Sequence, residues 1–213
     1  LPDANPQAIA EYIKQHCAPW LKHAGPDVVL YRGTNSLLGM EVATKKPRMD
    51  RRPTNTKEPK HRLFDTLIKM AGGTANRTNS VFVSPHRDDA ASYGSLFVVY
   101  PMGEFHYTWS PVYRDWFVDF RFSDMVREIP KKYHDLAKKE ELHGLDYMAA
   151  WRFNASDDIY NLDLYDPRLV QEIILTDQGI HDAVDGLNEV MITAENILYV
   201  DEELAPDVQE FLR

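Results

Sequence analysis

Three polar side chains interrupt segments that otherwise look like β-strands. Arg32 ends the apolar run 28–31, Ser84 ends "SVFVS", and Glu189 lies inside "LNEVMI". A charged side chain seldom follows such a run unless it has a partner. A guanidinium offers a planar fork that matches phosphate oxygens, and a fixed carboxylate stabilises positive charge that develops in a transition state. The three residues therefore predict one site, provided that the fold brings them together.

The elements before residue 95 can be placed by periodicity and by their end signals. Asn5-Pro6 is typical of a helix start, and apolar residues then follow a helical face through the first 25 residues, with Pro19 as a kink or stop. Further along we expect a strand at "DVVLYR", a helix at "PKHRLFDTLIKMAGG" that stops at its glycines, a strand at "NSVFVSP" and a short helix at "DDAASYG" capped by Asp88.

The second half of the chain predicts more strands. "SLFVVYP" and "EFHYTWS" read as two strands joined by a turn at Met102-Gly103, and Ser110-Pro111 as the start of a helix. A charged surface helix should follow, ending at Gly144, then strands at "LVQEIILT", "LNEVMIT" and "NILYV", and a short helix from Pro206 to Leu212. Because helices and strands do not alternate regularly, the pattern favours an α+β fold, and with no break in composition it indicates one domain over 1–213.

Composition excludes several classes of protein. The 213 residues are 44% hydrophobic, enough for a substantial core, and the single Cys17 rules out an internal disulfide framework. Neither a signal peptide nor an apolar stretch long enough to span a bilayer is recognisable, so we expect a cytoplasmic protein that makes no membrane contact. None of the eight histidines has metal-ligand spacing, and the GxGxxG, Walker A and GxSxG motifs are all missing. We expect no metal.

A basic stretch stands out in a chain whose formal net charge is -9. Residues 45–62 contain eight lysines and arginines against Asp50 and Glu58. This is typical of a solvated surface loop, and it also suits a loop that faces phosphate or nucleic acid, with Arg51 and Arg52 as contacts.

The order Arg32, Ser84, Glu189 resembles the Arg-Ser-Glu class of ADP-ribosyltransferases. The motifs that carry the resemblance lie between residues 28 and 200. They are Tyr31-Arg32-Gly33, then Phe82-Val83-Ser84 followed by Ala90, Ala91 and Tyr93, then Glu189-Val190-Met191-Ile192. The surrounding sequence also looks like bacteriophage proteins, which would put the chain in a host cytoplasm.

The resemblance implies a fold of two packed, mostly antiparallel sheets flanked by helices; the N-terminal helix over residues 1–25, expected from periodicity, precedes the part of the chain that carries the resemblance. It implies NAD as the substrate that supplies ADP-ribose. Glu189 would stabilise the oxocarbenium-like ribose, Arg32 would hold the phosphates, and Ser84 would hydrogen-bond Glu189. Gly33 and Thr34 would also lie at the dinucleotide, and Phe82 and Tyr93 would form the wall beside the nicotinamide ring.

Each of these residues also has a purely structural interpretation. Arg32 could form an ion pair, Ser84 could cap a turn before Pro85, and Glu189 could be an exposed strand residue. Phe82 and Tyr93 could belong to the core. His86 and Arg87 fit loop surface better than a phosphate contact.

Two departures from the family pattern bear on the acceptor. Ser84-Pro85-His86 replaces Ser-Thr-Ser, and Leu187 replaces the Glu or Gln that arginine-modifying members carry two residues before Glu189. The implied acceptor is therefore not arginine but a nucleic acid, another protein group, a small molecule or water. In the segment before Glu189, three acidic residues favour a cationic or hydroxyl acceptor: Asp177, Asp182 and Asp185.

Two other functions stay open. With water as acceptor, the protein would be an NAD glycohydrolase. Alternatively it would be a non-enzymatic module that binds nucleic acid or a host protein through the basic 45–62 loop.

Overall fold

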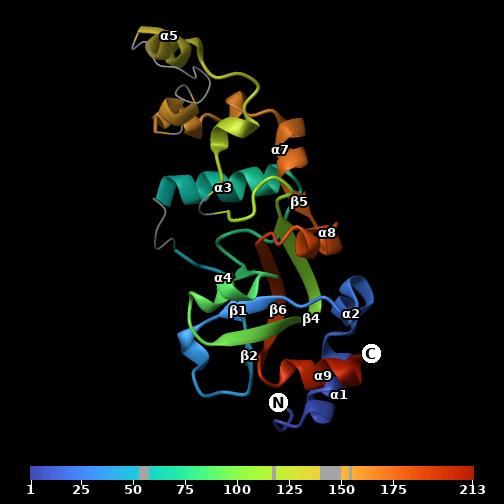
Figure 1. The fold of residues 1–213 in the computed structure, drawn as a ribbon. Helices are drawn as coiled ribbons and strands as arrows, with labels where there is room; N and C mark the ends of the chain where they lie inside the picture. Colours follow the sequence, from blue (N-terminus) through green and yellow to red (C-terminus); the bar gives the residue numbers. More distant parts are fainter. Residues whose placement is uncertain (53–57, 117–118, 140–149, 154) are drawn as a thin grey trace.

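The computed structural model describes residues 1–52, 58–116, 119–139, 150–153 and 155–213. Its α+β architecture is built on one six-stranded antiparallel sheet, with helices gathered at both ends (Figure 1). A second packed sheet, which the resemblance implied, is not confirmed in the part of the chain described here. The described helices include none that is both long and apolar enough to cross a membrane.

Two long strands form the centre of the sheet. Strand β4 (Leu96–Trp109) pairs with β6 (Val190–Asp201) along nearly its whole length. Four short strands extend the sheet. At the two ends of β4 lie β1 (Tyr31–Gly33) and β5 (Leu175–Thr176), each paired with β4. At the two ends of β6 lie β2 (Val42–Lys45) and β3 (Val81–Val83), each paired with β6.

The predicted hairpin at Met102-Gly103 is wrong, because β4 continues through it. Both halves of β4 pair with the same strand, and the register shifts between Met102 and Phe105. Gly103 has a φ of 70°, so the glycine permits a bulge rather than a chain reversal. The two predicted strands "LNEVMIT" and "NILYV" likewise merge into the single strand β6, which begins at Val190.

One hydrophobic core is formed with the helices of the two termini. These are α1 (Pro6–His16), α2 (Ala18–Ala24) and α9 (Ala205–Leu212). The Asn5 side chain caps α1 by accepting from the Ala8 N–H at 3.2 Å, and the helix ends at His16, with Cys17 as its C-cap. Ile9, Trp20 and Val208 are fully buried in this core. The predicted terminal helices are thus confirmed.

A second core lies at the other end of the sheet. It contains residues of α3 (Glu58–Met70), which confirms the predicted helix there, and of α7 (Pro167–Ile173). The expected strand at "LVQEIILT" is wrong over most of its length, because Asp166 caps a helix at Pro167 and only Leu175 and Thr176 pair as a strand. Alternation along β6 joins the two cores: Val190 and Ile192 belong to the first, and Met191 between them belongs to the second.

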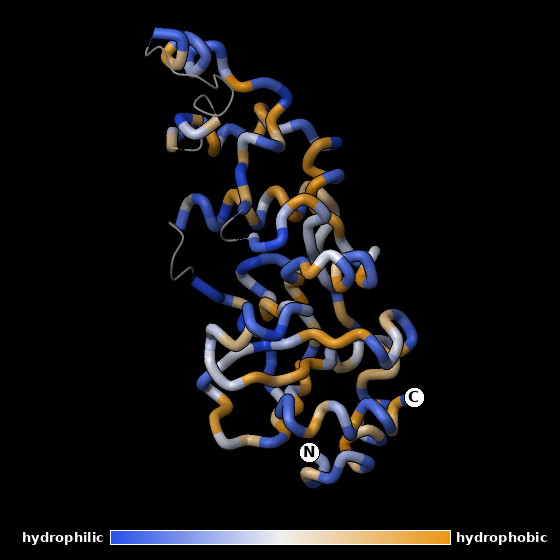
Figure 2. Tube along the Cα trace, in the orientation of Figure 1, coloured by the Kyte–Doolittle hydropathy of each residue, from blue (hydrophilic) through white to orange (hydrophobic). Residues whose placement is uncertain are grey.

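The remaining helices whose bounds lie within the described residues are short. They are α4 (Arg87–Ala91), α5 (Lys131–Lys139), α8 (Ile180–Asp185) and the 3-10 turns η1 (Asn35–Leu37), η2 (Phe122–Met125), η3 (Asp157–Tyr160) and η4 (Leu162–Leu164). Helix α5 is mostly hydrophilic, whereas the central strands are hydrophobic (Figure 2). Its predicted end at Gly144 lies outside the described residues.

Two local predictions need correction. His86, not Asp88, is the N-cap of α4, because Ser84 Oγ accepts the His86 N–H and turns the chain two residues earlier. Residues 110–116 form turns and bends instead of the expected helix. Ser110 Oγ accepts the N–H groups of Val112 and Tyr113, which closes a turn after β4.

Candidate functional site

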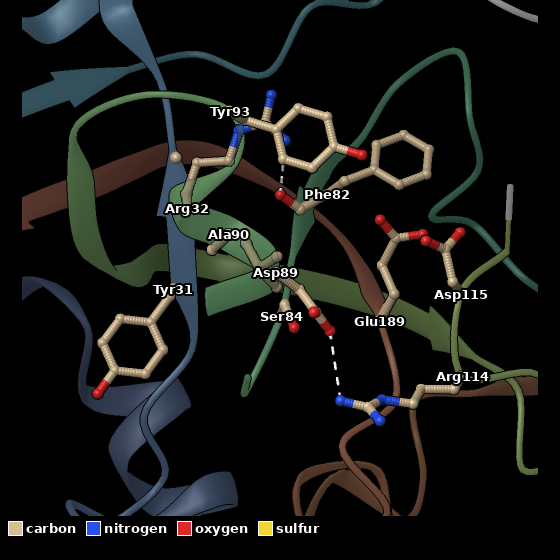
Figure 3. Close-up of a pocket in the computed structure, with 12 residues that line it drawn as sticks. Tyr31, Arg32, Phe82, Ser84, Asp89, Ala90, Tyr93, Arg114, Asp115 and Glu189 are labelled. Carbon is tan, nitrogen blue, oxygen red and sulfur yellow. Dashed lines mark hydrogen bonds and ion pairs between the residues drawn. The ribbon is translucent and has the colours of Figure 1, made fainter. Parts of the chain in front are cut away.

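The three residues singled out in the sequence line one pocket. Arg32 and Gly33 come from β1, Ser84 follows β3, and Glu189 precedes β6 (Figure 3). The complete lining is Tyr31, Arg32, Gly33, Phe82, Val83, Ser84, Asp89, Ala90, Tyr93, Arg114, Asp115 and Glu189. The cavity measures about 40 Å³, which is room for only a few water molecules.

Strand register explains why residues so far apart in sequence meet. Val83 pairs with Val190, so the next residues outward, Ser84 and Glu189, are opposite each other where the two strands end. On its other side Ser84 exchanges two backbone hydrogen bonds with Tyr31, at 2.8 and 2.9 Å. Arg32 is therefore placed beside both groups by backbone pairing alone.

The Arg32 guanidinium is anchored at one nitrogen. Its Nη1 donates to the Phe82 carbonyl oxygen at 2.9 Å, which holds the side chain over the pocket. A guanidinium has five donors, so this bond leaves others that can bind an anion.

Gly33 is required by a close contact with α4. A Cβ built at residue 33 would lie 1.8 Å from the Ala90 carbonyl oxygen. Strand β1 and helix α4 can pack this closely only with glycine at that position. The contact brings Asp89 and Tyr93 to the rim of the pocket, and Tyr93 remains 63% exposed there.

The Ser84 hydroxyl is engaged in the turn that follows β3. Its Oγ accepts the His86 N–H at 3.0 Å. The hydrogen bond to Glu189 that the resemblance implied is not formed among the residues described. A hydroxyl oxygen with one accepted bond can still donate its proton, so Ser84 remains able to bind a group in the pocket.

Glu189 carries the strongest electrostatic signal of the pocket. Burial, followed by the negative charge of Asp115, raises the pKa of Glu189 to about 7, against an ordinary value of 4.5. Arg77, Arg32 and a hydrogen bond from the Trp116 backbone act in the opposite direction. A carboxyl group with a pKa near neutrality is typical of a catalytic position.

Sequence reasoning missed Asp115, Arg114 and Asp89. All three line the pocket, and Arg114 Nη2 contacts Asp89 Oδ2 at 3.4 Å across its rim. The available signal was the charged dipeptide Arg114-Asp115 in the segment that follows the strand ending at Trp109. The mistaken helix over 110–116 concealed it, because charged residues on a helix are ordinarily solvated.

Two arginines lie against Phe82, and sequence reasoning missed one of them, Arg77. The Arg51 guanidinium lies 4.5 Å from the centre of the Phe82 ring, and that of Arg77 lies 5.2 Å from it. Arg77 is held by its backbone N–H, which donates to Asp65 of α3 at 2.8 Å. Phe82 thus packs against two cations while it also lines the pocket.

A larger basic groove adjoins the pocket through Arg32. It measures about 470 Å³ and is lined by six cationic residues: Arg32, Lys45, Lys46, Arg48, Arg51 and Arg52. Thr34 lies in this groove rather than in the small pocket. Burial and the charges of Arg32, Arg77 and Arg48 lower the pKa of Arg51 to about 10, which shows that these cations repel one another. An anion bound in the groove would relieve that repulsion.

Several other predicted contacts lie elsewhere. Arg87 forms a bidentate ion pair with Glu202, in which Nε and Nη2 of the arginine each donate to a carboxylate oxygen at 2.7 Å. Arg87 therefore belongs to the surface.

The three acidic residues of the segment before Glu189 are also engaged elsewhere. Asp177 accepts from the Tyr107 N–H at 2.7 Å, and Asp182 and Asp185 are part of α8. None of the three acids is among the residues that line the pocket. Leu187 is exposed, with a φ of 57°, and is also absent from the lining.

The arrangement can bind an anion in the basic groove and stabilise positive charge beside Glu189. Within the part of the chain that the structure describes, no cluster of three or more histidine, cysteine or acidic side chains could hold a metal ion. Comparison of the chain with protein-family models, with curated proteins and with solved structures finds no match, so the functional assignment depends on the site itself.

Proposed function

We propose that the protein cleaves the nicotinamide–ribose bond of NAD and transfers ADP-ribose to an acceptor other than arginine. The observation that carries this proposal is the convergence of Arg32, Ser84 and Glu189 from three strand ends on one pocket. When the bond breaks, positive charge develops on the ribose. A carboxylate held beside that charge lowers the barrier, and it does so most effectively where water is excluded.

The basic groove supports a dinucleotide as the substrate. Arg32 lines both cavities, so a molecule with its ribose at Glu189 would pass its two phosphates across Arg32 towards Arg51 and Arg52. Guanidinium groups match phosphate oxygens with paired hydrogen bonds. Tyr93, exposed at the rim, would turn aside to admit the nicotinamide ring, because the pocket as it stands is too small for the ring.

Nicotinamide release from NAD by the purified protein tests the proposal. We expect release by the native chain and a loss of about 10²–10³-fold in Glu189→Gln, in which the charge is removed at constant shape. Glu195→Gln is the matched control, since Glu195 lies on the same strand but is exposed. A native chain that releases no nicotinamide, or a Glu189→Gln variant as active as the native chain, would contradict the proposal. Mass spectrometry of the products then separates transfer to an acceptor from hydrolysis by water.

The basic groove also favours a second candidate function, binding of nucleic acid without turnover. Phosphate contacts made by lysine and arginine weaken steeply with salt, and for a single strand each contact adds about 0.7 to the slope of log K against log salt concentration. Neutralising Arg51 and Arg52 together should then weaken binding of a single-stranded oligonucleotide and reduce this slope by about 1.4. Arg62→Ala is the control, since Arg62 belongs to the same basic stretch but pairs with Glu58 at 3.0 Å outside the groove.

A further inference from the structure

Two carboxylates face each other in the pocket. Glu189 comes from the start of β6 and Asp115 from the loop after β4, and their oxygens point towards one another (Figure 3). Placing two acidic groups together in a partly buried site is unfavourable, because like charges repel where water cannot screen them. The fold must therefore hold Asp115 at this position.

Four hydrogen bonds provide that hold. The Asn188 side chain donates to the carbonyl oxygens of Ser110 at 2.8 Å and Tyr113 at 3.1 Å. The Glu189 N–H donates to the Arg114 carbonyl oxygen at 2.8 Å, and Trp116 Nε1 donates to the Glu189 carbonyl oxygen at 3.2 Å. The loop is thus bonded on both sides of Asp115 to the two residues that precede β6, so the backbone that carries the Asp115 carboxylate is held beside Glu189.

Burial and the neighbouring charges act on the Glu189 carboxyl in opposite directions. After burial, Asp115 contributes most to the raised pKa of Glu189, whereas Arg77 and Arg32 lower it. The Tyr93 hydroxyl and Arg51 also interact with Glu189, because its charge raises the pKa of each. Carboxyl pairs with unequal environments divide their work in other enzymes, where one stabilises charge and the other moves a proton.

We propose that Asp115 is a second catalytic carboxylate, which accepts the proton of the incoming acceptor while Glu189 stabilises the ribosyl cation. This rests on the function proposed above. In the step, the bond between ribose C1 and the nicotinamide nitrogen breaks, and its electron pair leaves with neutral nicotinamide. The acceptor atom forms the new bond to C1, and its proton passes to the Asp115 carboxylate. Charge and atoms balance without any further reactant.

The proposal narrows the acceptor. Two facing acids repel an anion, so a phosphate or carboxylate nucleophile is disfavoured. A neutral group that must lose a proton, such as a hydroxyl, an amine, the exocyclic amino group of a base, or water, is the class that Asp115 can activate.

Rescue by azide tests the role of Asp115, because azide is a nucleophile with no proton to lose. In Asp115→Ala we expect nicotinamide release from NAD to fall by about 10²–10⁴-fold. Sodium azide should raise it again by at least about 10-fold and yield ADP-ribosyl azide. Glu189→Gln should not respond to azide. The control is Asp88→Asn, which removes the same charge from an exposed side chain outside the pocket. An Asp115→Ala variant that keeps native activity, or that azide does not restore, would overturn the assignment.

Titration of Glu189 tests the pairing without turnover. With ¹³C-labelled glutamate, Asp115→Asn should lower the pKa of the Glu189 carboxyl, whereas Asp88→Asn should leave it unchanged. An unaltered titration would disprove the interaction. If the native chain releases no nicotinamide but this shift is observed, the proposed function and the base role of Asp115 fail while the carboxylate pair stands.

Discussion

The backbone N–H of Glu189 donates a 2.8 Å hydrogen bond to the carbonyl oxygen of Arg114. This bond joins the start of β6 to a loop more than 70 residues earlier in the chain. Arg114 in turn contacts Asp89 of α4 across the pocket rim at 3.4 Å. A shift in any one of the strand, the loop or the helix therefore disturbs the other two walls of the pocket.

Asn188 is the first residue whose loss should reveal this linkage. Asn188→Ala removes both side-chain bonds to the loop and leaves two buried carbonyl groups without that donor. We expect a loss of about 1–3 kcal/mol in the free energy of unfolding, from the unmade hydrogen bonds, and a fall in nicotinamide release as Asp115 loses its position. Urea unfolding and the release assay measure the two effects. If Asn188→Ala is less stable but keeps native activity, the two Asn188 hydrogen bonds are not needed to position Asp115.

Activity should depend on pH through Glu189. The carboxylate form stabilises the ribosyl cation, so kcat/KM should rise with pH and level off above a pKa of about 7. Asp115→Asn removes the like charge, which should lower the pKa of Glu189 and move this rise to lower pH. Initial rates of nicotinamide release between pH 5 and pH 9 test both statements, and a flat profile in the native chain would contradict them.

The buried Glu189 carboxyl should lower the free energy of unfolding at neutral pH. Its pKa is about 7 in the folded chain against 4.5 ordinarily, so between these values the unfolded chain releases a proton that the folded chain keeps. Stability contributed by this group therefore falls as pH rises from about 4.5 to 7. Glu189→Gln should melt close to the native chain at pH 4 and at a higher temperature at pH 8. Glu195→Gln should show no such difference, and equal melting of native and Glu189→Gln chains at pH 8 would refute the argument.

Gly33 should tolerate no side chain. Gly33→Ala places a methyl group against the Ala90 carbonyl oxygen, which is backbone and cannot rotate away. We expect a loss of about 1–3 kcal/mol, typical of overpacking, together with displacement of α4 and of Tyr93 at the pocket. Thermal unfolding and the KM for NAD measure these effects. Gly39→Ala is a useful comparison, because a Cβ there meets no atom within 4 Å and its cost arises only from the positive φ of 78°.

The parts of the site that the sequence predicted are those that depend on strand ends. Arg32, Ser84 and Glu189 could be recognised because each breaks an apolar run, and strand pairing then places them together. Their roles stay predictions. Asp115 and Arg77 could not be found in this way, because both lie in loops whose positions depend on distant bonds, to Glu189 and to Asp65 respectively.

The errors in the fold have a similar origin. "LVQEIILT" has the apolar content of a strand, yet the Asp166 cap and Pro167 start a helix there, and tertiary packing of Val170 decides the outcome. Gly103 looked like a turn because sequence alone does not distinguish a bulge in a long strand from a chain reversal. The helix could be predicted only with knowledge of the core that it packs against, and the bulge only with knowledge of the strand that pairs with β4.

The division of the interior between two cores has a consequence for how the molecule opens. Val190 is packed in one core and Met191 in the other, so the residue pair that follows Glu189 spans their boundary. Exchange of amide hydrogens under native conditions should therefore occur in two cooperative blocks, with the block around α3 and α7 separable from the block of the terminal helices. Opening of the former alone would release the anchorage of Arg77 and abolish turnover while the terminal helices remained protected.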